Sequence, residues 1–357
     1  MSLELGKKLI SQKNFKDAET VFLELKKNRN SFELNYNLAI VYFELRNLNK
    51  SLKYLEKCIK IDKNSLNTYL KIAFLEQARG DIEKSLSNYL KVIDINKNDV
   101  RAYYGIYTLD SKFLTTKHYK TILHINNNPK SNKLVRSLSE FLLSKKEKLE
   151  KNLDKEIDLL KNSHQLCFDF SKEYNLQSQK YYFNVIIELY NRTNYVHSDQ
   201  KENYFNNISP IFIIGLPRSG STLIEAILTS SEGNIPSFGE SAFVNMGVIN
   251  QLSPYILSNT QNFENYSFNL KDFENFIHKK YSQFSLINND KKLFIDKSLE
   301  NFHNIDFILN VFPKAKFIHC HRNPKDAIVG IYQSLLPKLS WTHTIKNIIT
   351  YIDNYKK

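Results

Sequence analysis

The sequence is poor in the residues that mark disulfide-rich, metal-binding and membrane-spanning proteins. Its 357 residues include three cysteines, at positions 58, 167 and 320, and so few, widely separated thiols indicate neither a disulfide framework nor a metal site. No apolar run approaches the length of a transmembrane helix, and the N-terminus lacks the apolar core of a signal peptide. We therefore expect a cytoplasmic protein without a metal and without a transmembrane segment.

Chain breakers are also scarce, with 9 glycines and 8 prolines, while 42% of the residues are hydrophobic. Most of the chain should therefore fold, and its length allows two domains. The formal net charge of +13 comes mainly from lysines that are spread along the chain. Dispersed lysine is more typical of a solvated surface than of a nucleic-acid groove, and no zinc-finger or RNA-recognition motif occurs. We expect no nucleic-acid partner, although the positive field suits anionic ligands.

The first part of the chain, residues 1–109, is repetitive. The segments K-N-F-K-D-A at 13–18, R-N-L-N-K-S at 46–51 and G-D-I-E-K-S at 80–85 follow one another at offsets of 33 and 34 residues. Ala18, Ser51 and Ser85 align as the small residue where two helices approach, and Ala39 and Ala73 align in the preceding helices. This period resembles tetratricopeptide repeats, three of them, with 100–109 as a candidate start of a fourth. The alternative is an unrelated helical bundle.

The repeat resemblance implies a solenoid whose concave surface binds a peptide or a partner protein. The next part, residues 110–205, has helical patterns without a clear period, and we expect it to cap the solenoid and connect it to a second domain. That second domain is expected to span residues 206–357.

The second domain begins with a strand, a glycine-bounded loop and a helix. Four apolar residues at 211–214 precede Gly215, and the loop runs to Thr222. Such a loop turns backbone N–H groups and the positive end of the helix dipole toward one place, which suits a phosphate or sulfate group. The phosphate-binding loop of nucleoside triphosphatases, G-x-x-x-x-G-K-[ST], has the same spacing, but Ser221 stands in place of its lysine. This argues against a nucleotide kinase or triphosphatase. A glycine turn with chance spacing is the plain alternative.

Strands and helices alternate in the rest of the domain. We expect strands at 293–295 and 316–320 and helices at 305–312 and 326–335. Such alternation predicts a parallel sheet with its ligands at the carboxyl ends of the strands. Arg218, Lys297 and Arg322 all fall at such ends. The predicted fold is thus multidomain, an all-α tetratricopeptide solenoid followed by an α/β P-loop-like domain with a parallel sheet.

These residues carry a resemblance to a known family. The 210–335 segment resembles sulfotransferases that use 3′-phosphoadenosine 5′-phosphosulfate. P-R-S-G-S-T at 217–222 is similar to their 5′-phosphosulfate loop, and H-R-N-P-K-D-A at 321–327 to their 3′-phosphate element. The order of motifs is most similar to tyrosylprotein sulfotransferases, and especially to bacterial proteins that join tetratricopeptide repeats to such a domain.

The resemblance implies a role for each matching residue. Glu240 would be the general base, Lys297 would stabilise the bridging oxygen and leaving phosphate, and Arg322 would bind the 3′-phosphate. It implies an acceptor with a hydroxyl group, protein tyrosine among them, although glycans, lipids and small alcohols are equally allowed. The 5′-phosphosulfate would be held by Pro217, Arg218, Ser219, Gly220, Ser221 and Thr222, with Arg218 also acting in the reaction.

Plainer interpretations stand beside these roles. Glu240 and Lys297 would then be surface residues, and Arg322 would pair with Asp326. The chain also departs from the family pattern: Gly330 replaces the usual serine, Asn323 replaces the usual aspartate, and the family commonly continues well past residue 357. We therefore consider a fragment or a shortened member. The alternative function is a tetratricopeptide scaffold with an inactive sulfotransferase-like domain.

Overall fold

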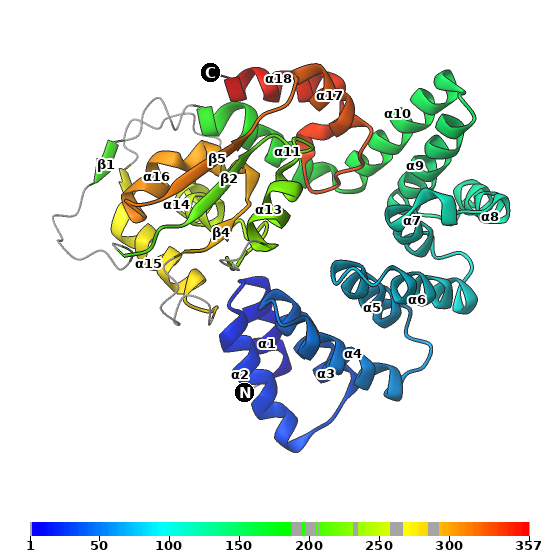
Figure 1. Cartoon of the computed structure of the whole chain (residues 1–357), viewed down its shortest axis with the longest axis horizontal. Coiled ribbons are helices and arrows are strands. Elements are labelled where there is room, and N and C mark those ends of the chain that lie inside the picture. The colour runs from blue at the N-terminus through cyan, green and yellow to red at the C-terminus, as the bar shows by residue number, and fades with distance from the viewer. Residues whose placement is uncertain are drawn as a thin grey trace. The chain divides into compact units, whose positions relative to one another are not determined.

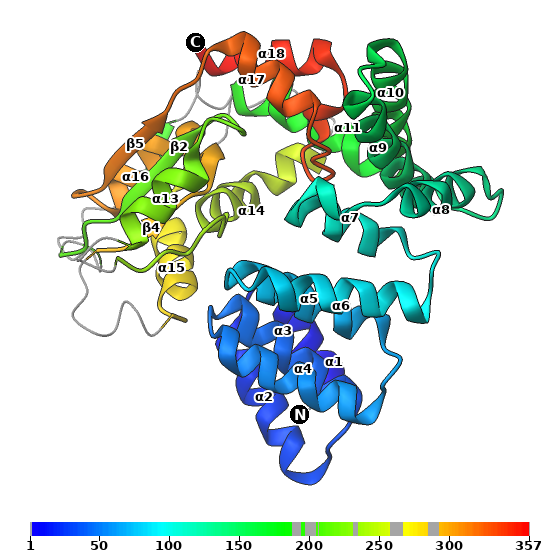
Figure 2. The same cartoon turned by 45° about the vertical axis from the view of Figure 1, so that its right-hand side comes forward.

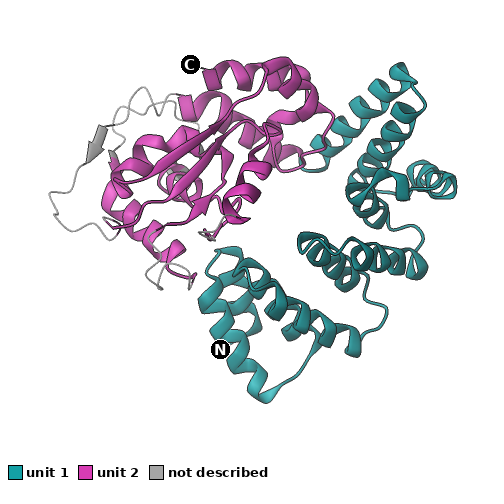
Figure 3. Cartoon of the chain, viewed as in Figure 1, with its two compact units in different colours: residues 1–171 teal, residues 172–357 magenta. Residues whose placement is uncertain are grey.

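The computed structural model (Figure 1) describes residues 2–187, 194–196, 205, 207–230, 235–257, 267–284 and 293–356. The chain divides after Ser171 into two compact units, residues 1–171 and residues 172–357 (Figure 3). This division falls inside the segment 110–205 that the sequence analysis treats as a connecting region. Among the described residues, none of the helices is both long and apolar enough to cross a membrane.

Unit 1 is built from consecutive antiparallel helices (Figure 2). Its helices alternate with short turns, so each helix packs mainly against its neighbours in sequence. The helices are α1 (Leu3–Ser11), α2 (Phe15–Asn28), α3 (Phe32–Glu44), α4 (Leu48–Ile61), α5 (Leu66–Ala78), α6 (Ile82–Ile95), α7 (Val100–Leu109), α8 (Thr116–Asn127), α9 (Lys133–Leu149) and α10 (Leu153–Phe170).

The repeat register predicted from the sequence appears as a repeated contact between helices. The hydroxyl of Ser51 on α4 donates to the carbonyl of Ala39 on α3 at 2.7 Å. The hydroxyl of Ser85 on α6 donates to the carbonyl of Ala73 on α5, also at 2.7 Å. All four residues are fully buried. The small side chains let the paired helices approach closely, and the hydroxyls satisfy a carbonyl inside the apolar interface.

Unit 2 contains a three-stranded parallel sheet in the order β4–β2–β5 (Figure 1). A second, two-stranded parallel pair joins β1 and β3. The predicted parallel sheet is thus present, although β4 begins two residues later than the strand expected at 293–295. The strands are β1 (Asn194–Val196), β2 (Ile211–Gly215), β3 (Ser267–Asn269), β4 (Ile295–Asp296) and β5 (Lys316–Cys320).

Helices flank these strands, and the loops between them carry the candidate site. The helices of unit 2 are α11 (Lys172–Lys180), α13 (Ser221–Ser230), α14 (Phe243–Leu257), α15 (Leu270–Tyr281), α16 (Ile305–Val311), α17 (Pro324–Tyr332) and α18 (Ile345–Lys356).

The central strand β2 is buried along its whole length, as its four apolar residues predict. Aromatic side chains pack beside it, with the rings of Phe212 and Phe317 stacked at 5.7 Å between centroids. At the end of β2, Gly215 has a φ of 140°, and a Cβ there would lie 2.5 Å from the carbonyl oxygen of Cys320 on β5. Only glycine therefore allows the two strands to stay paired up to the start of the loop.

A second apolar core lies between α17 and α18. The ring of Trp341 is stacked on that of Tyr351, with centroids 3.7 Å apart. Residues of α17 and α18 and the residue after β2 pack around this pair. The buried members of the core are Leu216, Ala327, Ile331, Trp341, Ile348, Tyr351 and Ile352. This core fixes α17 beside the loop that follows β2.

Candidate functional site

The loop after β2 has the backbone of an anion site. Gly220 has a φ of 93° and Arg218 a φ of 66°, so the chain turns sharply before α13 begins at Ser221. The hydroxyl oxygen of Ser219 is buried and has no hydrogen-bond partner among the described residues. A buried hydroxyl without a partner beside a helix N-terminus fits an anionic oxygen that would accept from it.

Lys297 brings a cation to this loop from the neighbouring strand. It directly follows β4, which pairs with β2, and only 7% of the residue is exposed. Its ammonium donates to the hydroxyl of Thr222 and to a carboxylate oxygen of Glu240, both at 3.2 Å. The structure thus brings together three residues that the sequence analysis assigned to one site.

Glu240 is presented by a tight loop that runs beside β4. The amide of Phe238 donates to the carbonyl of Ile295 at 2.9 Å, and the amide of Lys297 donates to the carbonyl of Gly239 at 2.9 Å. Gly239 and Ala242, which flank the glutamate, have positive φ values of 57° and 56°. The Glu240 side chain is 69% exposed, so its second oxygen is open to an incoming group.

Left-handed backbone at residues other than glycine is costly, by about 1 kcal/mol or more. In the described part of unit 2 it occurs at Arg218 and Ala242. One lies in the loop after β2 and the other beside Glu240. Such backbone persists where the surroundings hold it, and it gathers at functional sites.

A buried carboxylate supports the segment that carries Lys297. Asp296 is fully buried and accepts hydrogen bonds from the hydroxyl of Tyr281 at 2.6 Å and the amide of Ser298 at 2.8 Å. It also accepts from the hydroxyl of Ser241 and from the side-chain amide of Asn301. Burial, together with the Asp296 carboxylate, raises the pKa of Tyr281 well above its ordinary value. Tyr281 therefore stays a hydrogen-bond donor.

Arg322 reaches the loop from the other side. It follows β5, and its guanidinium donates to the main-chain carbonyl of Arg218 at 2.9 Å. Asn323, which replaces the aspartate expected from the resemblance, caps α17 by accepting from the amide of Lys325 at 2.9 Å. A cavity of about 460 Å³ adjoins Arg322 and is also lined by His319, His321 and Tyr355. Its size falls in the range of small-molecule sites.

Gly330, the other departure from the family pattern, lies beside the loop. A Cβ at this position would be 3.4 Å from the Cβ of Arg218, which is an ordinary contact distance. The hydroxyl of Ser334, one turn later, donates to the carbonyl of Gly330 at 2.8 Å. The hydroxyl of Ser334 therefore bonds to the last turn of α17 rather than to the loop.

The sequence analysis did not identify two residues near Lys297, namely Glu225 and Ser237. Glu225, on α13, places a carboxylate oxygen 3.2 Å from the ammonium of Lys297. Its other oxygen accepts a hydrogen bond from the hydroxyl of Ser237. Glu225 lies one helical turn after Thr222, and that spacing is the signal that could have placed it near the same lysine.

A further carboxylate, the partly buried Glu300, is close enough to feel the charge of Glu240. It accepts from the hydroxyl of Tyr182 at 2.7 Å and from the side-chain amide of Asn245 at 3.2 Å. Burial raises its pKa, and the negative charge of Glu240 acts in the same direction, while the hydrogen bond from Tyr182 opposes them. This network fixes the start of α14 close to the loop that carries Glu240.

Comparisons with known proteins match two separate parts of the chain. Residues 210–356 match the model of the Sulfotransferase family, and residues 32–65 match that of the Tetratricopeptide repeat. An uncharacterized protein of Aquifex aeolicus (strain VF5) is 27% identical over 224 residues, which cover 61% of this chain and 29% of that protein. The chain thus spans less than a third of that relative. It contains a sulfotransferase-family domain at residues 210–356 and a tetratricopeptide repeat at residues 32–65.

Proposed function

We propose that the domain transfers the sulfuryl group of 3′-phosphoadenosine 5′-phosphosulfate to a hydroxyl acceptor. The observation that carries this proposal is the contact of the Lys297 ammonium with both the Thr222 hydroxyl and the Glu240 carboxylate, at 3.2 Å each. It joins an anion-binding loop, a cation and a candidate base in one place. Sulfuryl transfer needs these three parts and depends on positioning and charge stabilisation.

The donor fits the two sides of the loop in different ways. Its 5′-phosphosulfate would accept from the backbone N–H groups of 218–222, from the unpartnered Ser219 hydroxyl and from the guanidinium of Arg218. Its 3′-phosphate would bind the exposed guanidinium of Arg322 on the other side. The cavity beside Arg322 offers room for the nucleoside. In the described part of the chain, no group of three or more His, Cys, Asp or Glu side chains is placed to hold a metal ion.

The chain's own residues would divide the transfer step between them. Glu240 takes the proton of the acceptor hydroxyl, whose oxygen forms the new bond to sulfur. The bond between sulfur and the bridging oxygen of the donor breaks in line, and that oxygen keeps the electron pair. Lys297 stabilises the charge that develops there. The products are the sulfated acceptor and adenosine 3′,5′-bisphosphate.

The acceptor we favour is a tyrosine in an acidic peptide, drawn to the chain by its charge of +13. Unit 1 has a surface that suits such a peptide. Phe74 on α5 is 47% exposed, its ring lies 5.8 Å from that of Phe43 on α3, and the ammonium of Lys71 lies 5.0 Å above the Phe43 ring. Exposed aromatic rings with a lysine offer apolar and anionic side chains a common binding surface.

One observation favours the alternative of a scaffold with an inactive domain. The hydroxyl that the family places at position 330 is absent, and the hydroxyl of Ser334 donates to the Gly330 carbonyl instead of facing the loop. A weakened 3′-phosphate site would follow. This alternative expects weak or absent donor binding and no turnover that depends on Glu240.

Calorimetric titration of the full chain with adenosine 3′,5′-bisphosphate tests the donor site without needing an acceptor. We expect binding at one site per chain, weakened about 10- to 100-fold by Arg218→Ala, because hydrogen bonds to charged groups contribute roughly 1.5–3 kcal/mol. Absence of binding to the wild-type chain would contradict the proposed function, since both anionic groups of the donor remain in this product.

A further inference from the structure

Lys297 is paired with two carboxylates, Glu225 and Glu240, that lie at the same distance of 3.2 Å from its ammonium but differ in how far they are exposed to solvent. We propose that Glu225 is a positioning residue that keeps Lys297 aimed at the loop, and that Glu240 gives up the same ammonium when the donor binds. The proposal rests on the proposed function, because it gives the two carboxylates different roles in that reaction.

The first argument is that Glu225 connects the three segments that form the site. It lies on α13, which begins within the loop after β2, and one oxygen pairs with Lys297 from the end of β4. The other oxygen accepts from the hydroxyl of Ser237, which in turn accepts from the amide of Gly239 at 2.9 Å. Gly239 immediately precedes Glu240. A single carboxylate therefore ties the loop helix to both the cation and the segment that presents the candidate base.

The second argument is the difference in burial between the two carboxylates. The side chain of Glu225 is 18% exposed, whereas that of Glu240 is 69% exposed, against 8% for Lys297. An ion pair that is largely removed from water is screened less than an exposed pair. Of the two contacts, the one to Glu240 is therefore the cheaper to break.

The third argument is charge and space around the ammonium. The ammonium of Lys297 donates to Thr222 and Glu240 and forms an ion pair with Glu225, all three at 3.2 Å. With three oxygens already this close, an oxygen of the phosphosulfate would displace the most exposed of these partners. Glu240 is the exposed one, and releasing it frees the carboxylate to accept a proton from the acceptor. Donor binding would thus activate the base, so the donor would bind before the acceptor reacts.

Steady-state kinetics of Glu225→Gln tests the positioning role. Glutamine still offers an oxygen to Ser237 but no charge to Lys297. We expect kcat to fall about 10- to 100-fold, as misplacing a reacting group by about 1 Å does, with the donor KM within about threefold of wild type.

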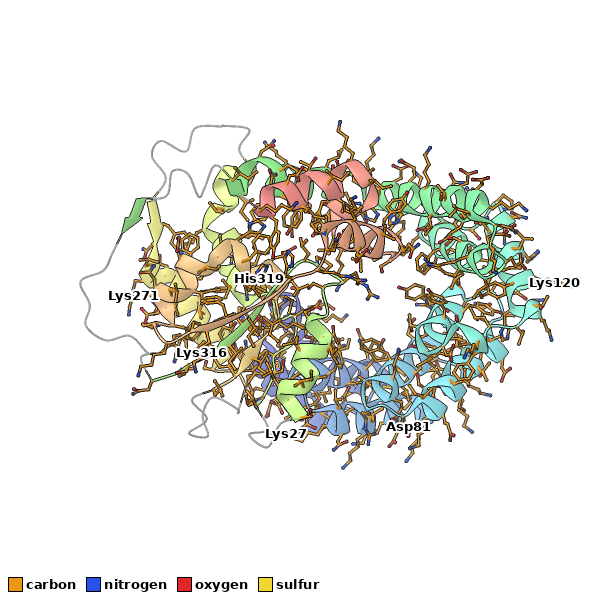
Figure 4. The ribbon with its side chains drawn as sticks, turned by 45° about the horizontal axis from the view of Figure 1, so that its top comes forward. Lys27, Asp81, Lys120, Lys271, Lys316 and His319 are labelled. Atoms are coloured by element: carbon orange, nitrogen blue, oxygen red, sulfur yellow. The ribbon has the colours of Figure 1, made fainter. Side chains whose placement is uncertain are left out.

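Glu274→Gln is the matched control. Glu274 on α15 is 12% exposed and pairs with Lys271 at 3.4 Å, so it is a comparable ion pair in the same unit. Lys271 lies at the periphery of the unit (Figure 4). This variant should leave kcat and the donor KM unchanged. If Glu225→Gln behaves like Glu274→Gln while the wild-type chain transfers sulfuryl groups, Glu225 has no positioning role.

A second measurement tests whether Glu225 anchors Lys297 and does not require sulfuryl transfer. The rate at which acetic anhydride modifies Lys297 can be followed by mass spectrometry in the donor-free protein, because the reagent needs an amine that is released from its partners. We expect Glu225→Gln to speed this modification about fivefold or more and Glu240→Gln less than about twofold, since the ion pair with the less exposed carboxylate is screened less by water. Ser237→Ala, which leaves both carboxylates in place, should give an intermediate rate and serves if Glu225→Gln does not fold.

The outcomes separate the two proposals. Equal modification rates in the Glu225 and Glu240 variants, or a larger effect of Glu240→Gln, would overturn the assignment of Glu225 as the anchor. Alternatively, the variants show the expected order of modification rates, but the wild-type chain neither binds the bisphosphate nor transfers label. That result would support Glu225 as the anchor of Lys297 and contradict the proposed sulfotransferase function.

Discussion

The guanidinium of Arg322 donates to the main-chain carbonyl of Arg218 at 2.9 Å. The residue after β5 therefore braces the loop after β2, in addition to the 3′-phosphate role that we propose for it. Because Arg218 stands in left-handed backbone, with a φ of 66°, this contact helps to hold the loop in a conformation that it would not favour alone.

Replacing Arg322 by alanine should weaken binding of adenosine 3′,5′-bisphosphate about 10- to 100-fold, through the loss of charge-assisted hydrogen bonds. Adenosine 5′-phosphosulfate, which lacks the 3′-phosphate, should lose much less affinity. Calorimetry with both ligands measures the difference. Lys325→Ala removes an exposed cation from the start of α17, three residues after Arg322, and is the matched control. Equal losses for the two ligands would mean that Arg322 acts only as a brace for the loop.

Gly330→Ser should strengthen donor binding. The structure accommodates a Cβ there at 3.4 Å from the Cβ of Arg218, and the added hydroxyl would face the loop side of α17. One hydrogen bond to an anionic group supplies about 1.5 kcal/mol, or roughly tenfold in affinity. Gly330→Ala adds the Cβ without the hydroxyl and separates helix stabilisation from ligand binding. An unchanged bisphosphate affinity in the serine variant would remove position 330 from the donor site.

The hydroxyl of Ser51 should contribute to the stability of unit 1. Ser51→Ala removes its 2.7 Å hydrogen bond to the Ala39 carbonyl, and we expect a loss of about 1 kcal/mol. Ser51→Val should cost more, about 1–3 kcal/mol, because it overpacks a close approach of two helices. Urea unfolding followed by circular dichroism measures both. Ser11→Ala is the control: it removes an exposed hydroxyl that donates to the carbonyl of Lys8 at 2.8 Å, and it should hardly change the free energy of unfolding. Near-neutral behaviour of Ser51→Val would show that the helices are not closely packed there.

Acid should destabilise unit 2 through His303. Burial lowers the pKa of His303 from its ordinary 6.5 to about 3. The unfolded chain therefore takes up a proton below pH 6.5 that the folded chain does not take up until about pH 3. Stability is fully present above pH 6.5 and falls between these values, by up to about 1.4 kcal/mol per pH unit.

Trp341 is the single tryptophan of the chain and stacks on Tyr351, whose hydroxyl lies 3.5 Å from Nε2 of His303. Its fluorescence during urea unfolding at pH 7 and pH 5 measures this dependence directly. His303→Gln should be less stable at pH 7 but should lose less on acidification. The same acid dependence in wild type and variant would assign the effect to other groups.

The sequence predicts the fold and the positions of the strongest site residues because local patterns determine them. The repeat offsets place Ser51 against Ala39, and the alternation of strands and helices places Lys297 at the end of the strand beside β2. Both are consequences of periodicity and of parallel strand order, which can be read without knowing distant contacts.

What the sequence could not supply is the set of contacts between segments far apart in the chain. Glu225 pairs with Lys297 across 72 positions, and Asp296 gathers Ser241 and Tyr281 from two other segments. The one-turn spacing from Thr222 indicates the side of the helix on which Glu225 lies but not its burial, and an aspartate at the end of a strand has no local pattern that distinguishes it from a surface residue. Their burial, which depends on the packed fold, reveals their place in the site.

The central claim is that this chain moves a sulfuryl group with Glu240 as the base. Its most direct test is transfer of radiolabelled sulfate from 3′-phosphoadenosine 5′-phosphosulfate to a panel of acidic tyrosine peptides, glycans, lipids and small alcohols. We predict labelled product with the wild-type chain. Glu240→Gln should lower the transfer rate at least about 100-fold, as loss of a general base does, with bisphosphate affinity equal to or tighter than wild type. No labelled product from any acceptor, or undiminished transfer by Glu240→Gln, would contradict the claim.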